Sequence, residues 1–203
     1  AVFGPHQEFF AAGRLDNLSS MHASVTALIN ADGGDVVQMV AAFDHEELGS
    51  ASRSGASGPV LADVLTRISS GLGATLDERY RSLAQSFCVS ADTGHAIHPN
   101  YSRRHDPLNQ PILNLGPLLK INANQRYATD GRSAALWRRI CRAAGISTQE
   151  FVSNNAVPCG STIGPLTATR LGIATVDVGI PTLSMHSARE LAGTEDPLAL
   201  TRA

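Results

Sequence analysis

The stretch Ile173-Ala174-Thr175-Val176-Asp177-Val178-Gly179-Ile180 is the clearest strand of this sequence, and Pro181 is expected to end it. Two more apolar runs of strand length lie at residues 36–43 and 116–121, and a shorter one lies at 86–91. Runs of this kind, without strict alternation, are typical of strands buried on both faces of a parallel sheet. They predict a largely parallel central sheet.

Segments with a helical spacing of apolar residues separate these predicted strands. The predicted helices are residues 15–30, 60–68, 75–85, 133–144, a segment capped by Ser161-Thr162 that ends near Leu171, and residues 187–191. Strands that alternate with helices are typical of α/β domains. A length of 203 residues fits one sizeable domain. We therefore predict an α/β fold with a mostly parallel central sheet and helices on both faces.

The overall composition disfavours several classes of protein. The net charge is −2, whereas nucleic-acid-binding proteins normally show a basic face. No apolar run reaches the roughly eighteen residues of a membrane span, and the first residues show no signal peptide. The three cysteines fit neither a zinc ribbon nor a disulfide framework. We therefore expect reduced thiols and a cytoplasmic protein, with neither nucleic acid nor membrane as a partner.

Acidic and histidine side chains occur in four short motifs. Asp16 lies in the first, Glu46 and Glu47 in the second, Asp92 in the third and His186 in the fourth. Several of these residues follow predicted strands, and ligands bind outside the carboxyl ends of strands in open α/β sheets. Three carboxylates and one histidine suit a pair of zinc ions, and a further carboxylate suits a general base. Hydrolysis is therefore the first hypothesis.

Each of these residues also has an ordinary structural explanation. Asp16 is well placed to cap a helix and Asp92 to open an Asx turn, while His186 fits a core or capping histidine. Glu46 and Glu47 fit a solvated acidic turn. On an extended segment, by contrast, they would point to opposite sides, one toward a metal and the other toward a water. The residues alone leave both explanations open.

The sequence lacks the motifs of other common enzyme classes. It contains no Gly-rich phosphate loop followed by lysine, no Gly-x-Ser-x-Gly elbow and no His-Glu-x-x-His helix. Cys159 has no histidine partner in a recognised local signature, which disfavours a thiol nucleophile.

Seven motifs, in the same order along the chain, resemble the aspartyl aminopeptidase family of dizinc metallopeptidases. They lie at residues 14–18, 43–50, 90–92, 95–101, 120–129, 158–165 and 184–187, within a match that runs from about Phe9 to Gly193. The resemblance implies a zinc-peptidase-like catalytic domain. It also implies removal of N-terminal residues, preferably Asp or Glu, from peptides through a water activated by two zinc ions.

The resemblance implies a role for each metal-site residue. Asp16 is expected to bridge both zinc ions, Glu47 and His186 to bind one of them, and Asp92 to bind the other. Glu46 is expected to act as the general base. Manganese or cobalt would also suit ligands that are rich in oxygen.

The resemblance also implies a substrate pocket lined by His95, Lys120 and Tyr127. Lys120 is a suitable partner for an acidic first side chain of the substrate, because a buried lysine pairs well with a carboxylate. The expected substrates are peptides with a free N-terminus, and the expected assembly is a homo-oligomer.

The family has two features that these residues do not show. Its remaining zinc ligand is a histidine upstream of the motif at 14–18, and a β-rich domain used in assembly is inserted between the two. His6 lies too close to Asp16 to be that ligand. We therefore expect residues 1–203 to be the second, larger part of an incomplete catalytic domain. The upstream segment of the same gene product would be its partner.

Two other functions stay open at this point. The same metal site would also serve an aminopeptidase of another specificity or a deacylase. Replacement of Lys120 would discriminate between these functions, because it should selectively lower the turnover of acidic substrates. A chain with an incomplete site would alternatively be a scaffold or a metal-binding subunit without catalysis.

Overall fold

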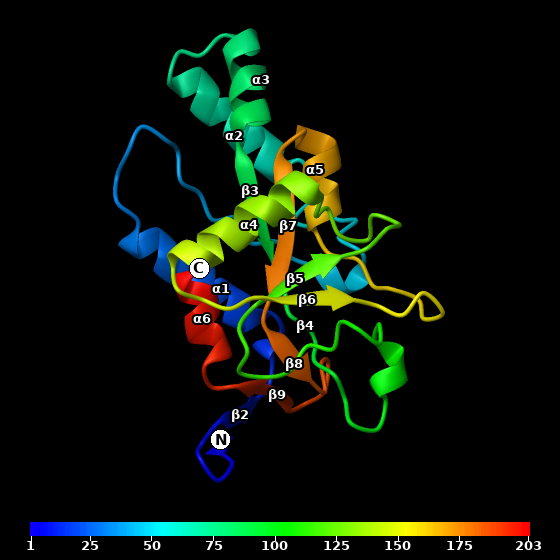
Figure 1. The fold of residues 1–203 in the computed structure, drawn as a ribbon. Helices are drawn as coiled ribbons and strands as arrows, with labels where there is room; N and C mark the ends of the chain where they lie inside the picture. Colours follow the sequence, from blue (N-terminus) through cyan, green and yellow to red (C-terminus); the bar gives the residue numbers. More distant parts are fainter.

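The computed structural model describes all 203 residues as one α/β fold (Figure 1). Its helices are α1 (Leu15–Asn30), α2 (Val60–Gly71), α3 (Leu76–Gln85), α4 (Gly131–Ala143), α5 (Gly164–Leu171) and α6 (Asp196–Arg202). Its strands are β1 (Val2–Phe3), β2 (Phe9–Ala12), β3 (Phe87–Ala91), β4 (Gly94–His95), β5 (Leu118–Ile121), β6 (Gln149–Val152), β7 (Ala174–Gly179), β8 (Pro181–Leu183) and β9 (Glu190–Gly193). Short 3-10 helices lie at Glu46–Leu48 and Ser102–Arg104.

The central sheet has the strand order β3-β7-β5-β6. β3 runs parallel to β7 and β5 runs parallel to β6, whereas β5 and β7 are antiparallel. Two of the three pairings are therefore parallel, as the sequence predicts. The strand at 173–180 lies inside this sheet as β7.

β7 presents different side chains to the two faces of the sheet. Val176 and Val178 are fully buried in the main core, which includes Trp137 of α4 and Leu200 of α6. Asp177, between the two valines, faces the opposite side, where the first residue of α5, Gly164, lies against its carboxylate. Helices therefore cover both faces, which confirms the predicted layers.

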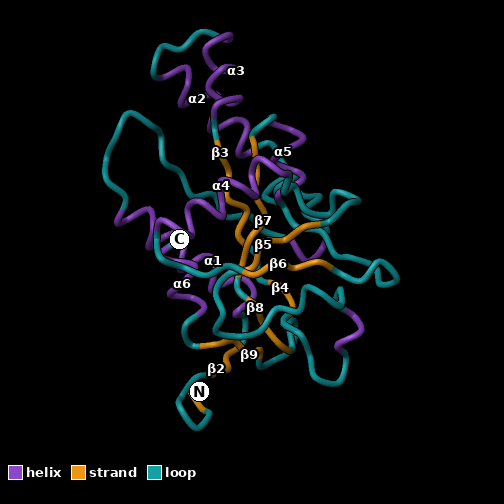
Figure 2. The backbone as a smooth tube through the Cα atoms, viewed as in Figure 1, coloured by secondary structure: helices purple, strands orange, loops and turns teal.

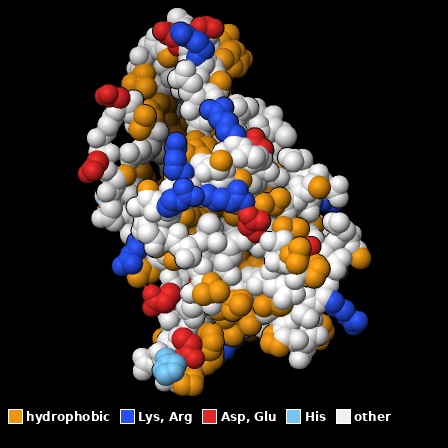
Figure 3. Space-filling model, viewed as in Figure 1, with side chains coloured by type: hydrophobic (Ala, Val, Ile, Leu, Met, Phe, Trp, Pro, Cys, Tyr) orange, Lys and Arg blue, Asp and Glu red, His pale blue; other side chains and the backbone are white.

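Helix α4 shows how the sequence pattern produces this packing. Its Trp137 and Cys141 are buried, and its solvent side carries four arginines. Basic side chains gather over this helix in Figure 3. The Asp130 side chain accepts a hydrogen bond from the Ser133 backbone N–H and caps the first turn. The helix is therefore held by an apolar stripe and a capping box.

A second sheet, which the sequence pattern did not predict, has the order β1-β2-β9-β8-β4. It joins the start of the chain to the segment after β7, because β2 pairs antiparallel with β9 (Figure 2). Pro181 does end β7, but it also begins β8, a first position that proline tolerates in a strand.

Two predicted elements are wrong. Residues 36–43 form an irregular segment in place of a strand, and Val36 and Val37 are 71% and 60% exposed. No strand pairs with this run. Residues 187–191 contain a turn and the start of β9 in place of a helix. Thr162 also does not cap α5, because its hydroxyl donates to Asp177.

Helices α2 and α3 project from the rest of the molecule (Figures 1 and 2). Helix α2 has no buried residue, and α3 buries Leu83 alone. No helix of the structure is both long enough and apolar enough to span a membrane.

Candidate active site

All eight residues that the sequence singled out line one cleft of about 770 Å³. They are Asp16, Glu46, Glu47, Asp92, His95, Lys120, Tyr127 and His186. They come from the start of α1, the 3-10 helix at Glu46–Leu48, the end of β3, strands β4 and β5, the loop between β5 and α4, and the turn after β8. The fold therefore brings together residues up to 170 positions apart.

Asp16, Glu47 and His186 form the closest cluster in the cleft. His186 Nε2 lies 3.1 Å from Asp16 Oδ2 and 3.0 Å from Glu47 Oε1. One ligand atom from each residue lies within 4.8 Å of the others. Two carboxylates and an imidazole are a donor set that suits Zn²⁺.

A compact loop brings Glu47 to this cluster. Glu46 and Glu47 begin a 3-10 helix after His45, which has a left-handed conformation with φ 64°. This local structure corrects the predicted extended segment. Arg170 of α5 donates hydrogen bonds to the carbonyls of Ala56 and Gly58, and so connects the end of this loop to helix α5.

Asp92, directly after β3, lies next to Asp16. Burial raises the pKa of Asp16 to about 7, and the neighbouring charges of Asp92 and then Glu47 add to this effect. Carboxylates crowded in this way repel each other unless a proton or a cation lies between them. This crowding is the second observation that fits a metal ion.

Glu46 lies beside the cluster without joining it. Burial raises the pKa of its carboxyl, followed by the charges of Asp92 and Glu47, whereas the charges of Lys120 and His186 lower it. A raised pKa makes a carboxylate a stronger base, better suited to take up and return a proton. The geometry therefore separates one potential base from the potential ligands.

Lys120 lies at the inner wall of the cleft and is only 2% exposed. Its ammonium donates to Asp92 Oδ2 at 3.1 Å and to the Thr93 carbonyl at 2.7 Å. The same nitrogen lies 5.5 Å from the centre of the Tyr127 ring. Lys120 therefore connects Asp92, a predicted metal ligand, to the predicted substrate pocket.

His95 and Tyr127 complete this wall. Burial lowers the pKa of His95, and the charges of His105 and Lys120 act in the same direction, so the neutral imidazole is favoured. Burial also raises the pKa of Tyr127, whose hydroxyl accepts a hydrogen bond from Cys159 Sγ at 3.4 Å. The wall thus combines an aromatic ring, a neutral imidazole and a buried cation.

Sequence reasoning missed two buried carboxylates that support the site. Glu190 is 2% exposed and accepts the backbone N–H groups of Asp16 and His186. Asp177 is fully buried and accepts from the Ala128 N–H and the Thr162 hydroxyl. Asp177 carried one signal, because a charged residue inside an apolar strand needs partners.

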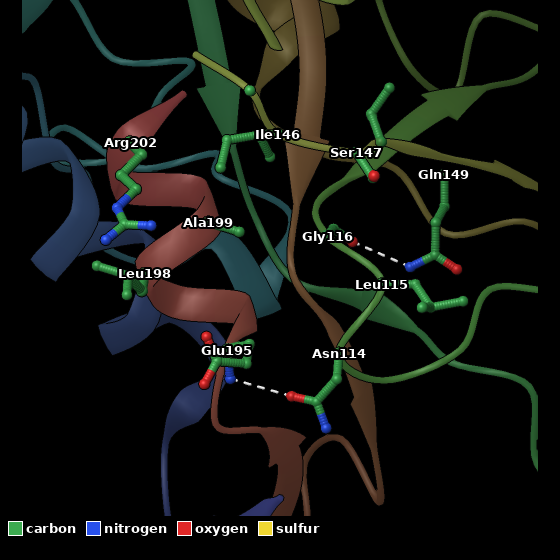
Figure 4. A pocket seen from close by; sticks show the side chains of 12 residues that line it. Asn114, Leu115, Gly116, Ile146, Ser147, Gln149, Glu195, Leu198, Ala199 and Arg202 are labelled. Atoms are coloured by element: carbon green, nitrogen blue, oxygen red, sulfur yellow. Dashed lines mark hydrogen bonds between the residues drawn. The ribbon is translucent and has the colours of Figure 1, made fainter. Parts of the chain in front are cut away.

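A second cavity, of about 430 Å³, lies between α6 and the segments before β5 and β6 (Figure 4). Its amide side chains are used within the fold. Gln149 donates to the Gly116 carbonyl, and Asn114 Oδ1 accepts the Glu195 N–H. The cavity contains no cluster of metal-ligating groups comparable to the first cleft.

A family model described as "Aminopeptidase I zinc metalloprotease (M18)" matches residues 1–203. The chain belongs to this M18 family. It is 52% identical to "Probable M18 family aminopeptidase 2" of Streptomyces coelicolor, with 100% of this chain and 48% of that protein covered. The family resemblance inferred from the seven motifs is thereby confirmed.

Solved M18 structures share the fold. Yeast aminopeptidase 1 (Ape1) matches with a TM-score of 0.87 and 32% identity, over 100% of this chain and 46% of that one. A structure of the S. cerevisiae mApe1 dodecamer matches with a TM-score of 0.86 and 31% identity, with 100% and 46% covered. The chain therefore spans about half the length of the M18 proteins it matches.

Proposed function

We propose that this protein is a zinc aminopeptidase that removes N-terminal residues, preferably acidic ones, from peptides. The observation that carries the proposal is the convergence of Asp16, Glu47 and His186 in a large cleft, with Glu46 beside them. Membership of a zinc metalloprotease family supports the choice of metal.

Asp16, Glu47 and His186 would hold one zinc ion, and Asp16 with Asp92 would hold a second. Zinc supplies Lewis acidity that polarises a carbonyl group and lowers the pKa of water toward neutrality. Asp16 and Asp92 alone would give the second zinc ion two protein ligands, whereas a catalytic zinc ion usually has three. A histidine from a segment of the gene product outside residues 1–203 would complete the second position.

Glu46 is the proposed general base. It would take a proton from the attacking water and return it to the leaving amine, which its raised pKa favours. The buried ion pair between Lys120 and Asp92 fixes one wall of the site while this proton moves. Water and the substrate carbonyl would meet between Glu46 and the cluster of ligands.

Lys120 is also the proposed partner of an acidic first side chain. An ammonium has three donors, and Asp92 and the Thr93 carbonyl use two of them. The third donor would bond a substrate carboxylate in the cleft that Lys120 lines. Neutral His95 beside it would add a hydrogen bond without repelling the lysine.

The proposed assembly is a homo-oligomer, and the dodecamer of S. cerevisiae mApe1 supports this expectation. The proposed location is the cytoplasm. The three cysteines are all free thiols, which suits a reducing compartment.

The test is hydrolysis of chromogenic substrates, with added zinc, by the purified gene product that includes the segment proposed to supply the remaining histidine ligand. We expect cleavage of N-terminal aspartyl substrates, slower cleavage of leucyl substrates and none of N-acetylated ones. Glu46→Gln should lower kcat at least about 100-fold, since general acid–base catalysis contributes about 10²–10⁴-fold. Exposed Glu195, beside the second cavity, gives the control Glu195→Gln, which should keep full activity. Full activity of Glu46→Gln would refute the proposed role.

A further inference from the structure

Glu190 is a buried carboxylate without a cationic partner. It lies on β9, beside β2 and β8 in the second sheet (Figure 1), and is 2% exposed. A carboxylate in such a place is unfavourable unless hydrogen bonds replace its hydration. Each of its two oxygens accepts a hydrogen bond from one backbone N–H group, and these two bonds replace its hydration.

The two bonds lead to two potential metal ligands. Glu190 Oε2 accepts the Asp16 N–H at 2.8 Å, and Glu190 Oε1 accepts the His186 N–H at 2.7 Å. Asp16 and His186 are 170 positions apart in sequence, yet their side chains meet at 3.1 Å. One carboxylate therefore holds the backbones of two ligand-bearing segments at the point where the ligands converge.

Neither ligand-bearing segment has a regular local structure at this point. His186 has a left-handed backbone with φ 66°, in a turn between β8 and β9. Asp16 has a non-helical backbone at the start of α1, with ψ 108°. The ladder of hydrogen bonds in a helix or sheet does not fix either residue there. The Glu190 carboxylate supplies the missing restraint through two charge-assisted hydrogen bonds.

We propose that Glu190 is a positioning residue, whose carboxylate clamps the backbones of Asp16 and His186 so that both side chains can hold one zinc ion. This inference rests on the proposed function of the cleft. It assigns Glu190 no contact with substrate or with zinc. Its effect is on the arrangement of the ligands before the metal binds.

The variant Glu190→Gln keeps the size of the side chain but replaces one accepting oxygen by an amide N–H₂ group. One of the two clamping bonds is then lost. We expect zinc affinity, measured by isothermal titration calorimetry, to fall about 10- to 100-fold, as for other groups that orient metal ligands. Activity at limiting zinc should fall in parallel and recover in excess zinc. The KM for the substrate should not change.

Asp196 provides a matched control. It is also a fully buried carboxylate that accepts two backbone N–H groups, from Asn114 at 2.8 Å and from Gly116 at 3.3 Å. Those residues line the second cavity (Figure 4), whereas Asp16, Glu47 and His186 line the first cleft. Asp196→Asn should lower stability as Glu190→Gln does, but leave zinc affinity within about twofold of the wild type. Equal zinc affinities of wild type and Glu190→Gln would overturn the inference.

Amide hydrogen exchange tests the clamp without any variant and without metal. The Asp16 and His186 amides should exchange slowly in the wild-type protein, because Glu190 is their hydrogen-bond partner. Exchange at the rate of unprotected amides would overturn the clamp even if the variant failed to fold. A wild-type protein that bound no zinc would instead refute the proposed function, while slow exchange at the two amides would still establish the clamp itself.

Discussion

The substitution Lys120→Met tests the inner wall of the cleft. Methionine replaces the aliphatic stem of Lys120 but removes the ammonium that bonds Asp92 and the Thr93 carbonyl. Removing one partner of a buried ion pair costs about 3–5 kcal/mol, because the other charge stays buried. The Asp92 side chain keeps 20% of its surface exposed, so water screens part of its charge. We therefore expect a loss near the lower limit, about 3 kcal/mol in free energy of unfolding.

The assay is urea denaturation of the metal-free protein, followed by the same titration in saturating zinc. A bound cation beside Asp92 should replace the lost ammonium and reduce the destabilisation to about 1–2 kcal/mol. The exposed pair Arg81–Asp77, at 3.0 Å, gives the control Arg81→Met. This control should cost less than about 1 kcal/mol, as surface ion pairs do.

The same variant tests the proposed specificity. Lys120→Met should lower kcat/KM for aspartyl substrates more strongly than for leucyl substrates. An equal loss for both substrates would mean that Lys120 only pairs with Asp92 and does not recognise the acidic side chain of the substrate. A metal-free destabilisation no larger than that of Arg81→Met would refute the buried-pair reasoning altogether.

Three further perturbations test other parts of the structure. The metal-free protein holds the Asp16 proton up to a pKa of about 7, whereas the unfolded chain releases it near pH 4. Metal-free stability should therefore fall as the pH rises through this window, and zinc affinity should weaken about tenfold per pH unit below 7, by urea titration and calorimetry respectively. Gly164→Ala should cost about 2 kcal/mol in urea denaturation, because its Cβ would overlap the Asp177 carboxylate. Trp137→Ala should cost about 3–5 kcal/mol, because the ring is 2% exposed and its N–H bonds Thr148; a loss below about 1 kcal/mol would contradict its place in the core.

The helices and the central sheet could be predicted because their patterns are local. The strand around Val176 and the helix around Trp137 each show their buried face within about ten residues. Residues 36–43 misled the prediction, because an apolar run shows a strand only if another strand pairs with it. The second sheet was missed because its strands have two to four residues each, too few to show a period.

For the candidate site, the sequence could predict which residues take part but not how they are arranged. The motifs named residues that line the cleft, but the loop that carries Glu46 and Glu47 is held at its far end by distant Arg170, which donates to the Ala56 carbonyl. Glu190 likewise joins the segment around His186, four residues before it, to the distant Asp16, and no local pattern relates these two parts of the chain. Such contacts are products of the tertiary fold.

The distance along the chain between Asp16 and His186 has a thermodynamic consequence. A metal ion held by both residues would act as a reversible cross-link that closes a loop of 170 residues. Closing a flexible loop of that length costs about 4–5 kcal/mol of chain entropy. Folding has already brought the two residues together, so only the unfolded chain would lose this entropy on binding the metal. Zinc would therefore discriminate strongly between folded and unfolded chains. Any substitution that loosens the connection between the two ends should weaken zinc binding, however far it lies from the metal.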